Sequence, residues 1–188
     1  MAPELTEMDM PSSDLPRLPR GLSLLAGTLP LMPVSLALTR LTRDLSARHP
    51  GIRARLGSFA DRRFLLDLED LPVVLLLEPG GDRPRVRACR RGREPGHDAR
   101  IRGPVSAFLG MLHGRLDGDA LFFSRDLVVE GDTEAVLALR NAIDDAEIDL
   151  SEEAGHLTGL AAPAVRGALG LAERLTGVAL SRGLEAGA

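Results

Sequence analysis

The side chains best suited to catalysis or metal binding are few and widely separated. His49, His97, His113 and His156 include no pair at a spacing such as His-x-x-x-His, which would place two imidazoles on one helical face. The single cysteine, Cys89, lies in a strand-like stretch, and a structural thiol is favoured there over a nucleophile or a cluster ligand. A lone cysteine also excludes an intrachain disulfide and fits a reducing cytoplasm.

The acidic residues Glu130, Asp132 and Glu134 are the other candidates for metal binding. Asp132 stands where a helix cap is expected and Glu134 suits the first turn of that helix, so capping and solvent exposure explain the group better than a metal does. The sequence contains no Gly-x-Ser-x-Gly, phosphate-loop or dinucleotide fingerprint. We therefore expect no catalytic residue, no metal and no cofactor.

Eight arginines fall between Arg83 and Arg102. A surface for nucleic acid would place aromatic side chains among them, and this stretch has none; the net charge of −4 also argues against nucleic acid. A solvated strand face is preferred, with an anionic membrane or an acidic partner protein as alternatives. The acidic run 144–153 is either solvated or docks a basic partner.

The length of 188 residues suits one domain with appended segments. We expect a disordered tail over 1–16, an apolar and amphipathic helical segment over 17–49, a central domain over 50–150, and an amphipathic helix with a tail over 151–188. The acidic, Pro- and Ser-rich start is unlike a signal peptide, which begins with basic residues.

Residues 21–39 are uncharged and just long enough to raise the question of a membrane span. Pro30 and Pro33 would interrupt the helical hydrogen bonds that lipid makes obligatory, which argues against a span. We expect instead a short apolar helix over 21–29 and a second helix that starts near Pro33 and ends before Pro50.

The middle of the chain has the periodicity of strands. Residues 63–68, 73–77, 85–91 and 99–102 either alternate between apolar and polar or are continuously apolar. Sequential strands joined by short connections favour an antiparallel sheet.

A helix starting at Pro104 follows, then two strand-like pieces at 120–124 and 127–130, and then a helix that Asp132 caps and that runs to about Ala146. Strands and helices in this order predict an α+β fold. Its antiparallel sheet carries helices packed on one face, and amphipathic helices flank it.

Seven apolar side chains of these elements converge on the space between sheet and helices: Phe108, Leu112, Phe122, Leu127, Val129, Leu139 and Ile143. They either fill an ordinary core or line an apolar cavity, and apolar faces alone favour the core.

Residues 161–180 form an amphipathic pattern with apolar side chains over about half of the helical wheel. Leu171, Leu175 and Val178 lie on this apolar side. Such a helix contacts a membrane interface, covers the mouth of a pocket, or packs on the domain, and the sequence leaves these alternatives open.

The stretch 104–150 resembles the C-terminal part of the sterol carrier protein 2 (SCP2) family. The family pattern runs helix, Gly-basic-Leu-Asp, a Phe-containing strand, an apolar strand, Gly-Asp and helix. The matching residues are Gly114, Arg115, Leu116, Asp117, Phe122, Leu127, Val129, Gly131, Asp132 and Leu139. Within that family, the run DALFFSRDLVVEGDTE is similar to accessory factors of ubiquinone biosynthesis. Over 56–102 only the strand order supports the resemblance.

The resemblance implies an SCP2-like fold that encloses an apolar cavity and has no catalytic role. Such a protein binds and presents lipophilic ubiquinone intermediates, or phospholipid, in oxygen-independent ubiquinone biosynthesis. It implies two partners that resemble U32 peptidases and carry iron–sulfur clusters, and a cytoplasmic location with reversible attachment to the inner face of the cytoplasmic membrane. The alternative is an interaction adaptor that docks these partners without carrying lipid.

Overall fold

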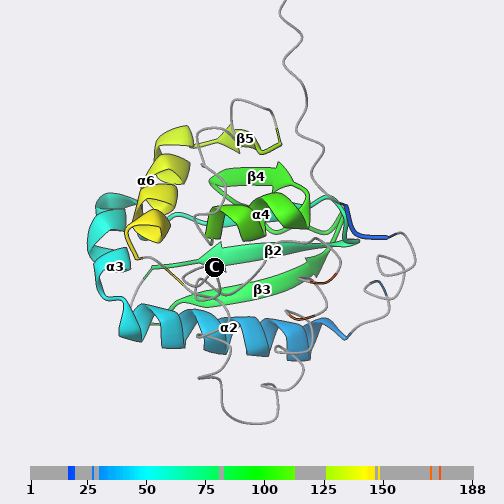
Figure 1. The fold of residues 1–188 in the computed structure, drawn as a ribbon, viewed down its shortest axis with the longest axis horizontal. Coiled ribbons are helices and arrows are strands. Elements are labelled where there is room, and N and C mark those ends of the chain that lie inside the picture. Colours follow the sequence, from blue (N-terminus) through cyan, green and yellow to red (C-terminus); the bar gives the residue numbers. More distant parts are fainter. Residues whose placement is uncertain are drawn as a thin grey trace, which may run out of the picture.

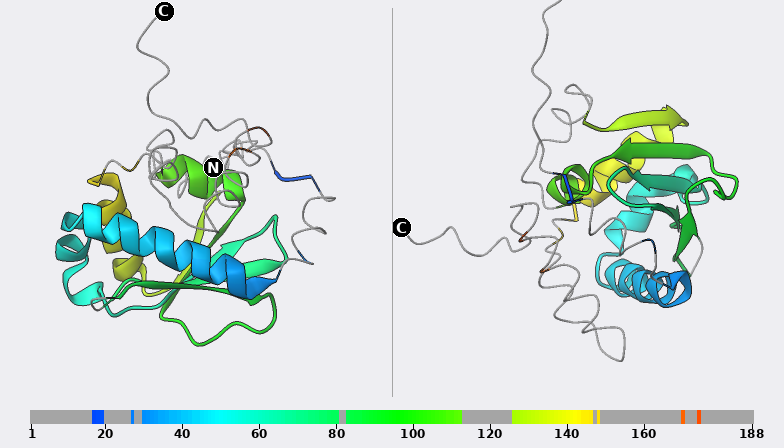
Figure 2. Two further views of the ribbon diagram at one scale, coloured as in Figure 1. Left: turned by 90° about the horizontal axis from the view of Figure 1, so that it is seen from below. Right: turned by 90° about the vertical axis from the view of Figure 1, so that its right-hand side faces the viewer.

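A computed structural model shows a five-stranded sheet with helices gathered on one of its faces (Figures 1 and 2). The structure describes residues 17–19, 27, 30–80, 83–112, 126–146, 148, 170 and 174, and for Leu112 the backbone alone. The arrangement confirms the α+β class predicted from the sequence.

The described helices are α2 (Leu31–Arg48), α3 (Gly51–Leu56), the 3-10 turn η1 (Gly57–Phe59), α4 (Val105–Leu112) and α6 (Thr133–Asp144). The helix predicted to start near Pro33 is α2, and Pro33 lies in its first turn, where the missing N–H has no partner to lose. The helix predicted over 21–29 lies outside the described residues except for Gly27, which is helical. The helix predicted over 161–180 also lies outside them, apart from two helical residues, Gly170 and Arg174.

The strands are β1 (Phe64–Leu68), β2 (Val73–Glu78), β3 (Arg85–Arg90), β4 (Ala99–Gly103) and β5 (Val128–Gly131). They form one sheet in the order β3-β2-β1-β4-β5. Each agrees with a predicted strand to within one residue at either end. The strand predicted over 120–124 lies outside the described residues.

One strand pair corrects the expectation of an antiparallel sheet. β1 runs parallel to β4, with Leu66 opposite Ile101, whereas the pairs β1–β2, β2–β3 and β4–β5 are antiparallel. The expectation assumed that β4 follows β3 as its neighbour. Instead the loop over 91–98, here called the crossover loop, carries the chain across β2 and β1, and a crossover of this kind makes the next strand parallel.

The crossover loop lies on the side of the sheet opposite the helices, which Figure 2 (right) shows edge-on. Its last residue, Asp98, donates its backbone N–H to the carbonyl of Arg63 (2.9 Å). On this side Leu65, Val74 and Leu76 are fully buried, although none of the described helices covers them. We call this side of the sheet the loop face and the opposite side the helix face.

Helix α2 closes the outer edge of β3 (Figure 1). The Thr39 hydroxyl donates to the carbonyl of Val86 (2.8 Å) and accepts the N–H of the same residue (3.0 Å). The Ser35 hydroxyl accepts the N–H of Ala88 (2.9 Å). These contacts satisfy backbone groups that an edge strand otherwise leaves open, so no further strand pairs there. This is the physical reason that β4 joins β1 instead.

Strand β5 passes into α6 through Gly131 and Asp132. Gly131 has a φ of +86°, and a Cβ at this position would collide with the carbonyl oxygen of Asp98, so glycine is needed here. The Asp132 carboxylate accepts the N–H of Ala135 (3.0 Å), which confirms the predicted helix cap. The turn directs Leu139 of α6 into the core beneath.

Candidate functional site

Much of the helix face is closed by close packing. On the β4 side, Phe64 and Ile101 are at most 1% exposed and belong to the same apolar cluster as Phe108 of α4 and Leu139 of α6. At the other edge, where α2 lies against β3, Val86 is also buried. Both margins of the sheet are therefore covered by described helices.

Between these covered margins, β1 and β2 present four half-buried side chains that we call the leucine strip: Leu66, Leu68, Leu75 and Leu77. Leu66 and Leu75 lie opposite each other in the strand register. On the same two strands, Leu65 and Leu76 point to the loop face and are fully buried. The central strands are thus more exposed on the side where the helices lie than on the side without them.

A row of incompletely buried apolar side chains on a sheet is suited to contact with an apolar ligand. An aliphatic chain lying on the leucine strip would lose water from both surfaces, and each buried methylene contributes about 0.8 kcal/mol. The strip consists only of aliphatic side chains. It is therefore suited to contact with an apolar chain and contains no nucleophilic, acidic or basic group.

The predicted site residues meet in one place where the structure describes them. Phe108, Leu127 and Leu139 are buried, and Val129 and Ile143 are half-buried and pack against the same cluster. Three residues of the leucine strip, Leu66, Leu68 and Leu77, also pack against this cluster, so the cluster adjoins the strip. The side chain of Leu112 and the whole of Phe122 lie outside the described residues, as do the predicted membrane-contacting residues Leu171, Leu175 and Val178.

The leucine strip itself was not among the predicted site residues. Its signal in the sequence is β2, which reads Val-Val-Leu-Leu-Leu and so has apolar side chains on both faces. Such a strand is expected to be covered on both sides. The sequence does not show that Val74 and Leu76 are fully buried on one face of β2 while Leu75 and Leu77 are only partly buried on the other.

Two surface hollows of about 390 and 460 Å³ flank the corner between α2 and α3. Arg48 and Arg55 line the first, and Arg43 and Arg53 line the second together with Leu56. Neither contains a residue of the leucine strip, so both are separate from the candidate site.

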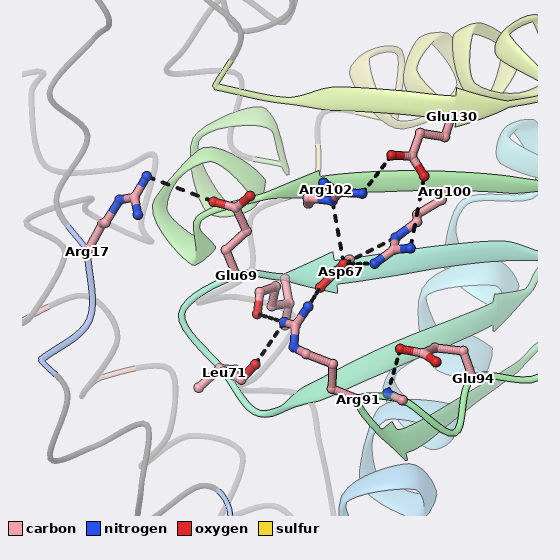
Figure 3. A network of polar contacts seen from close by, with 11 residues as sticks. Arg17, Asp67, Glu69, Leu71, Arg91, Glu94, Arg100, Arg102 and Glu130 are labelled. Carbon is pink, nitrogen blue, oxygen red and sulfur yellow. Dashed lines mark hydrogen bonds and ion pairs between the residues drawn. The ribbon is translucent and has the colours of Figure 1, made fainter.

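The loop face carries a cluster of charges around one buried carboxylate (Figure 3). Asp67 is 0% exposed, forms ion pairs with Arg91 and Arg100, and lies 3.7 Å from Arg102. Arg102 also donates to Glu130 (2.6 Å). Burial opposes ionisation of Asp67, but hydrogen bonds from Arg100 and Arg91 outweigh it, and the pKa of Asp67 lies below its usual value. The ionised cluster ties the start of the crossover loop to β1 and β4.

The candidates for metal binding have structural roles. Asp132 caps α6, and Glu130 pairs with Arg102. In the part of the chain that the structure describes, no three His, Cys, Asp or Glu side chains are placed to share a metal ion. None of the helices described there is both long and apolar enough to cross a bilayer.

A solved structure of an SCP2 protein shares this fold. The structure titled "UbiJ-SCP2 Ubiquinone synthesis protein" aligns with a TM-score of 0.52 at 19% identity, over 63% of this chain and 96% of that one. A sterol carrier protein 2 from Yarrowia lipolytica in its apo form aligns with a TM-score of 0.43 at 16% identity, over 58% of this chain and 89% of that one. At these identities the likeness shows the fold alone.

The family is shown by a comparison of the sequence with family models. A comparison with curated proteins gives no match. The model of the SCP-2 sterol transfer family, however, matches residues 42–144, from the second half of α2 to the end of α6. Because this match spans more than half of the chain, the protein belongs to the SCP-2 sterol transfer family.

Proposed function

We propose that this protein is a non-catalytic accessory factor that binds a lipid on the helix face, with the leucine strip as the floor of the site. The incomplete burial of Leu66 and Leu75, which lie opposite each other in the centre of the sheet, carries this proposal. Membership of the SCP-2 sterol transfer family supports an apolar cargo. Phe108, Leu127 and Leu139, with their partly buried neighbours, form the wall of the site on the β4 side.

The proposed cargo is a lipophilic intermediate of ubiquinone biosynthesis, or a phospholipid. The resemblance of 104–150 to the accessory factor UbiT supports this class, as does the fold shared with a protein titled as a ubiquinone synthesis protein. In this role the protein acts in the oxygen-independent route, together with two U32-peptidase-like proteins that carry iron–sulfur clusters.

Native mass spectrometry of the purified protein tests the lipid-binding role. We expect the wild-type protein to retain co-purified lipid. Leu75→Glu should lose most of it, because a carboxylate on the leucine strip would have to be desolvated by the bound chain. Leu137→Glu is the matched control, since Leu137 lies on α6 and is already 54% exposed. Equal lipid retention in both variants would show that the leucine strip is not part of the lipid-binding site.

Cell growth without oxygen tests the pathway. Deleting the gene should lower the ubiquinone content of cells grown anaerobically and leave the aerobic content unchanged. An equal loss under both conditions would contradict the assignment to the oxygen-independent route while leaving lipid binding itself intact.

The proposal includes reversible attachment to an anionic membrane, since a carrier must exchange its cargo with a bilayer. Met32 and Leu36 are 74% and 65% exposed, one turn apart on α2, and Arg40 follows one turn later. Apolar side chains at this spacing enter a lipid interface, and a nearby arginine adds about 1 kcal/mol of attraction to anionic headgroups. The C-terminal residues Leu171, Leu175 and Val178 are the second proposed contact.

Co-sedimentation with anionic vesicles measures this attachment. Leu36→Glu should reduce the bound fraction, whereas Leu137→Glu should leave it near the wild-type value because α6 is not the contact. Higher salt should weaken binding, since it screens the electrostatic part. Wild-type protein that stays in the supernatant at low salt would show that α2 does not contact lipid.

A protein-interaction adaptor is the second candidate function. The dense packing of Phe108, Leu127 and Leu139 in one buried cluster favours it, because these residues already fill an ordinary core. Protein that carries no lipid after isolation, and takes up none from vesicles, would support the adaptor over the carrier.

A further inference from the structure

The segment 83–102 is strongly basic, although the protein as a whole is acidic. Residues 83–102 contain eight arginines and two acids, Glu94 and Asp98, which gives a formal charge of +6. The whole chain has a formal charge of −4, so the remainder carries −10. A separation of this size creates a local positive potential that attracts an oppositely charged partner.

Seven of these arginines fall into two groups, and the eighth, Arg90, is half-buried at the end of β3. Arg91, Arg100 and Arg102 surround the buried carboxylate of Asp67 and are engaged within the fold. The other group lies along β3 and the crossover loop on the exposed surface, and we call it the arginine row: Arg83, Arg85, Arg87 and Arg93. All four side chains are exposed.

The arginine row has a regular geometry. Arg85 and Arg87 lie opposite Glu78 and Leu76 in the strand register, which places both on the loop face. Alternate residues of a strand are about 7 Å apart, so their guanidinium groups repeat at that interval. Arg87 lies 3.6 Å from Glu78, whereas no described carboxylate is within ion-pair distance of Arg85 or Arg93. The row therefore has cationic groups available for a partner.

The chemistry of the surrounding surface selects the class of partner. A membrane contact needs large apolar side chains among the arginines, and among the described residues Met32 and Leu36 supply these on α2 instead. The exposed Val128 on the loop face belongs to β5, at the opposite edge of the sheet. A guanidinium group binds a carboxylate through two parallel hydrogen bonds. Arginines at alternate positions of a strand have the same spacing as carboxylates at alternate positions of an extended acidic segment.

We propose that the arginine row is a docking surface for an acidic protein. It lies on the loop face and the crossover loop, so lipid on the helix face and a protein partner on the arginine row can be bound at the same time. The inference goes beyond the proposed function and does not depend on it.

Fluorescence anisotropy with a labelled poly-L-glutamate peptide and full-length protein tests the docking surface. The double variant R85E/R93E should bind the peptide about tenfold more weakly than the wild type or worse, because two attractive charges become repulsive. The matched control is R40E/R53E, which changes the net charge equally with exposed arginines of α2 and α3. It should stay within about twofold of the wild type.

Each other outcome overturns the proposal. Equal weakening by both double variants would mean that the peptide responds to net charge alone. Absence of peptide binding in the wild type, with R85E/R93E losing attachment to anionic vesicles, would mean that the row binds a membrane. Self-association of the wild type that R85E/R93E abolishes would identify a second copy as the occupant. Lipid content measured on the same samples reports separately on the proposed carrier function.

Discussion

At the residue scale, Asp67 explains how a charged side chain occupies the centre of the sheet. It follows Leu66 in β1 and points to the loop face, where the alternation of the strand places a polar residue. No feature of the sequence indicates that Asp67 is buried. Its burial depends on the crossover loop, and the arginines that pair with it come from distant positions, Arg91 and Arg100.

The Asp67 cluster makes stability depend on pH. The pKa of Asp67 is lowered in the folded state, so between the folded and unfolded pKa values the unfolded chain binds more protons. The stabilisation is fully present above the unfolded value, near 3.9, and is lost as the pH falls through the folded value. We therefore expect the free energy of unfolding of the wild type to decrease steeply below about pH 4.

The variant Asp67→Asn isolates this contribution. At neutral pH it should lower the free energy of unfolding by about 2–3 kcal/mol, because three arginines lose their buried partner but are themselves partly solvated. Its stability should then fall less steeply with acid than that of the wild type. Denaturant titrations at several pH values measure both effects, and parallel pH profiles for the two proteins would contradict the role of Asp67.

At the scale of elements, α2 acts as the border of the sheet. Strand and helix positions were predictable because apolar periodicity is local, and β1 to β5 agree closely with the predicted strands. Strand pairing was not predictable in the same way. Hydroxyl groups of Ser35 and Thr39 on α2 close the β3 edge, and no local pattern reveals that a helix some 47 residues away in sequence does this.

The variant Thr39→Val tests this border. It keeps the shape of the side chain but leaves the N–H and carbonyl of Val86 buried without partners, which should lower the free energy of unfolding by about 1–3 kcal/mol. Thr42→Val is the matched control, because the Thr42 hydroxyl donates to Leu38 within the same helix. The control should change stability by less than about 0.5 kcal/mol. Equal effects of the two variants in denaturant titrations would contradict the edge-closing role.

At the scale of the whole molecule, the two faces of the sheet differ in burial and in charge. The loop face buries Leu65, Val74 and Leu76 and carries charge, whereas the helix face is covered at both margins and leaves the leucine strip half-buried. The sequence identified Phe108, Leu127 and Leu139 as apolar residues that meet. The sequence alone could not show whether these residues fill a closed core or border an incompletely covered part of the sheet. That depends on how α2, α4 and α6 pack on the sheet.

Leucine methyl NMR tests the central claim most directly, because β1 and β2 place leucines on both faces. With leucine methyl groups labelled, a spin-labelled fatty acid should broaden the signals of Leu66, Leu75 and Leu77 on the helix face. The signals of Leu65 and Leu76, on the same strands but directed to the loop face, should be broadened less at the same concentration of fatty acid. Broadening of Leu65 and Leu76 instead, or of none of these leucines, would contradict lipid binding on the leucine strip.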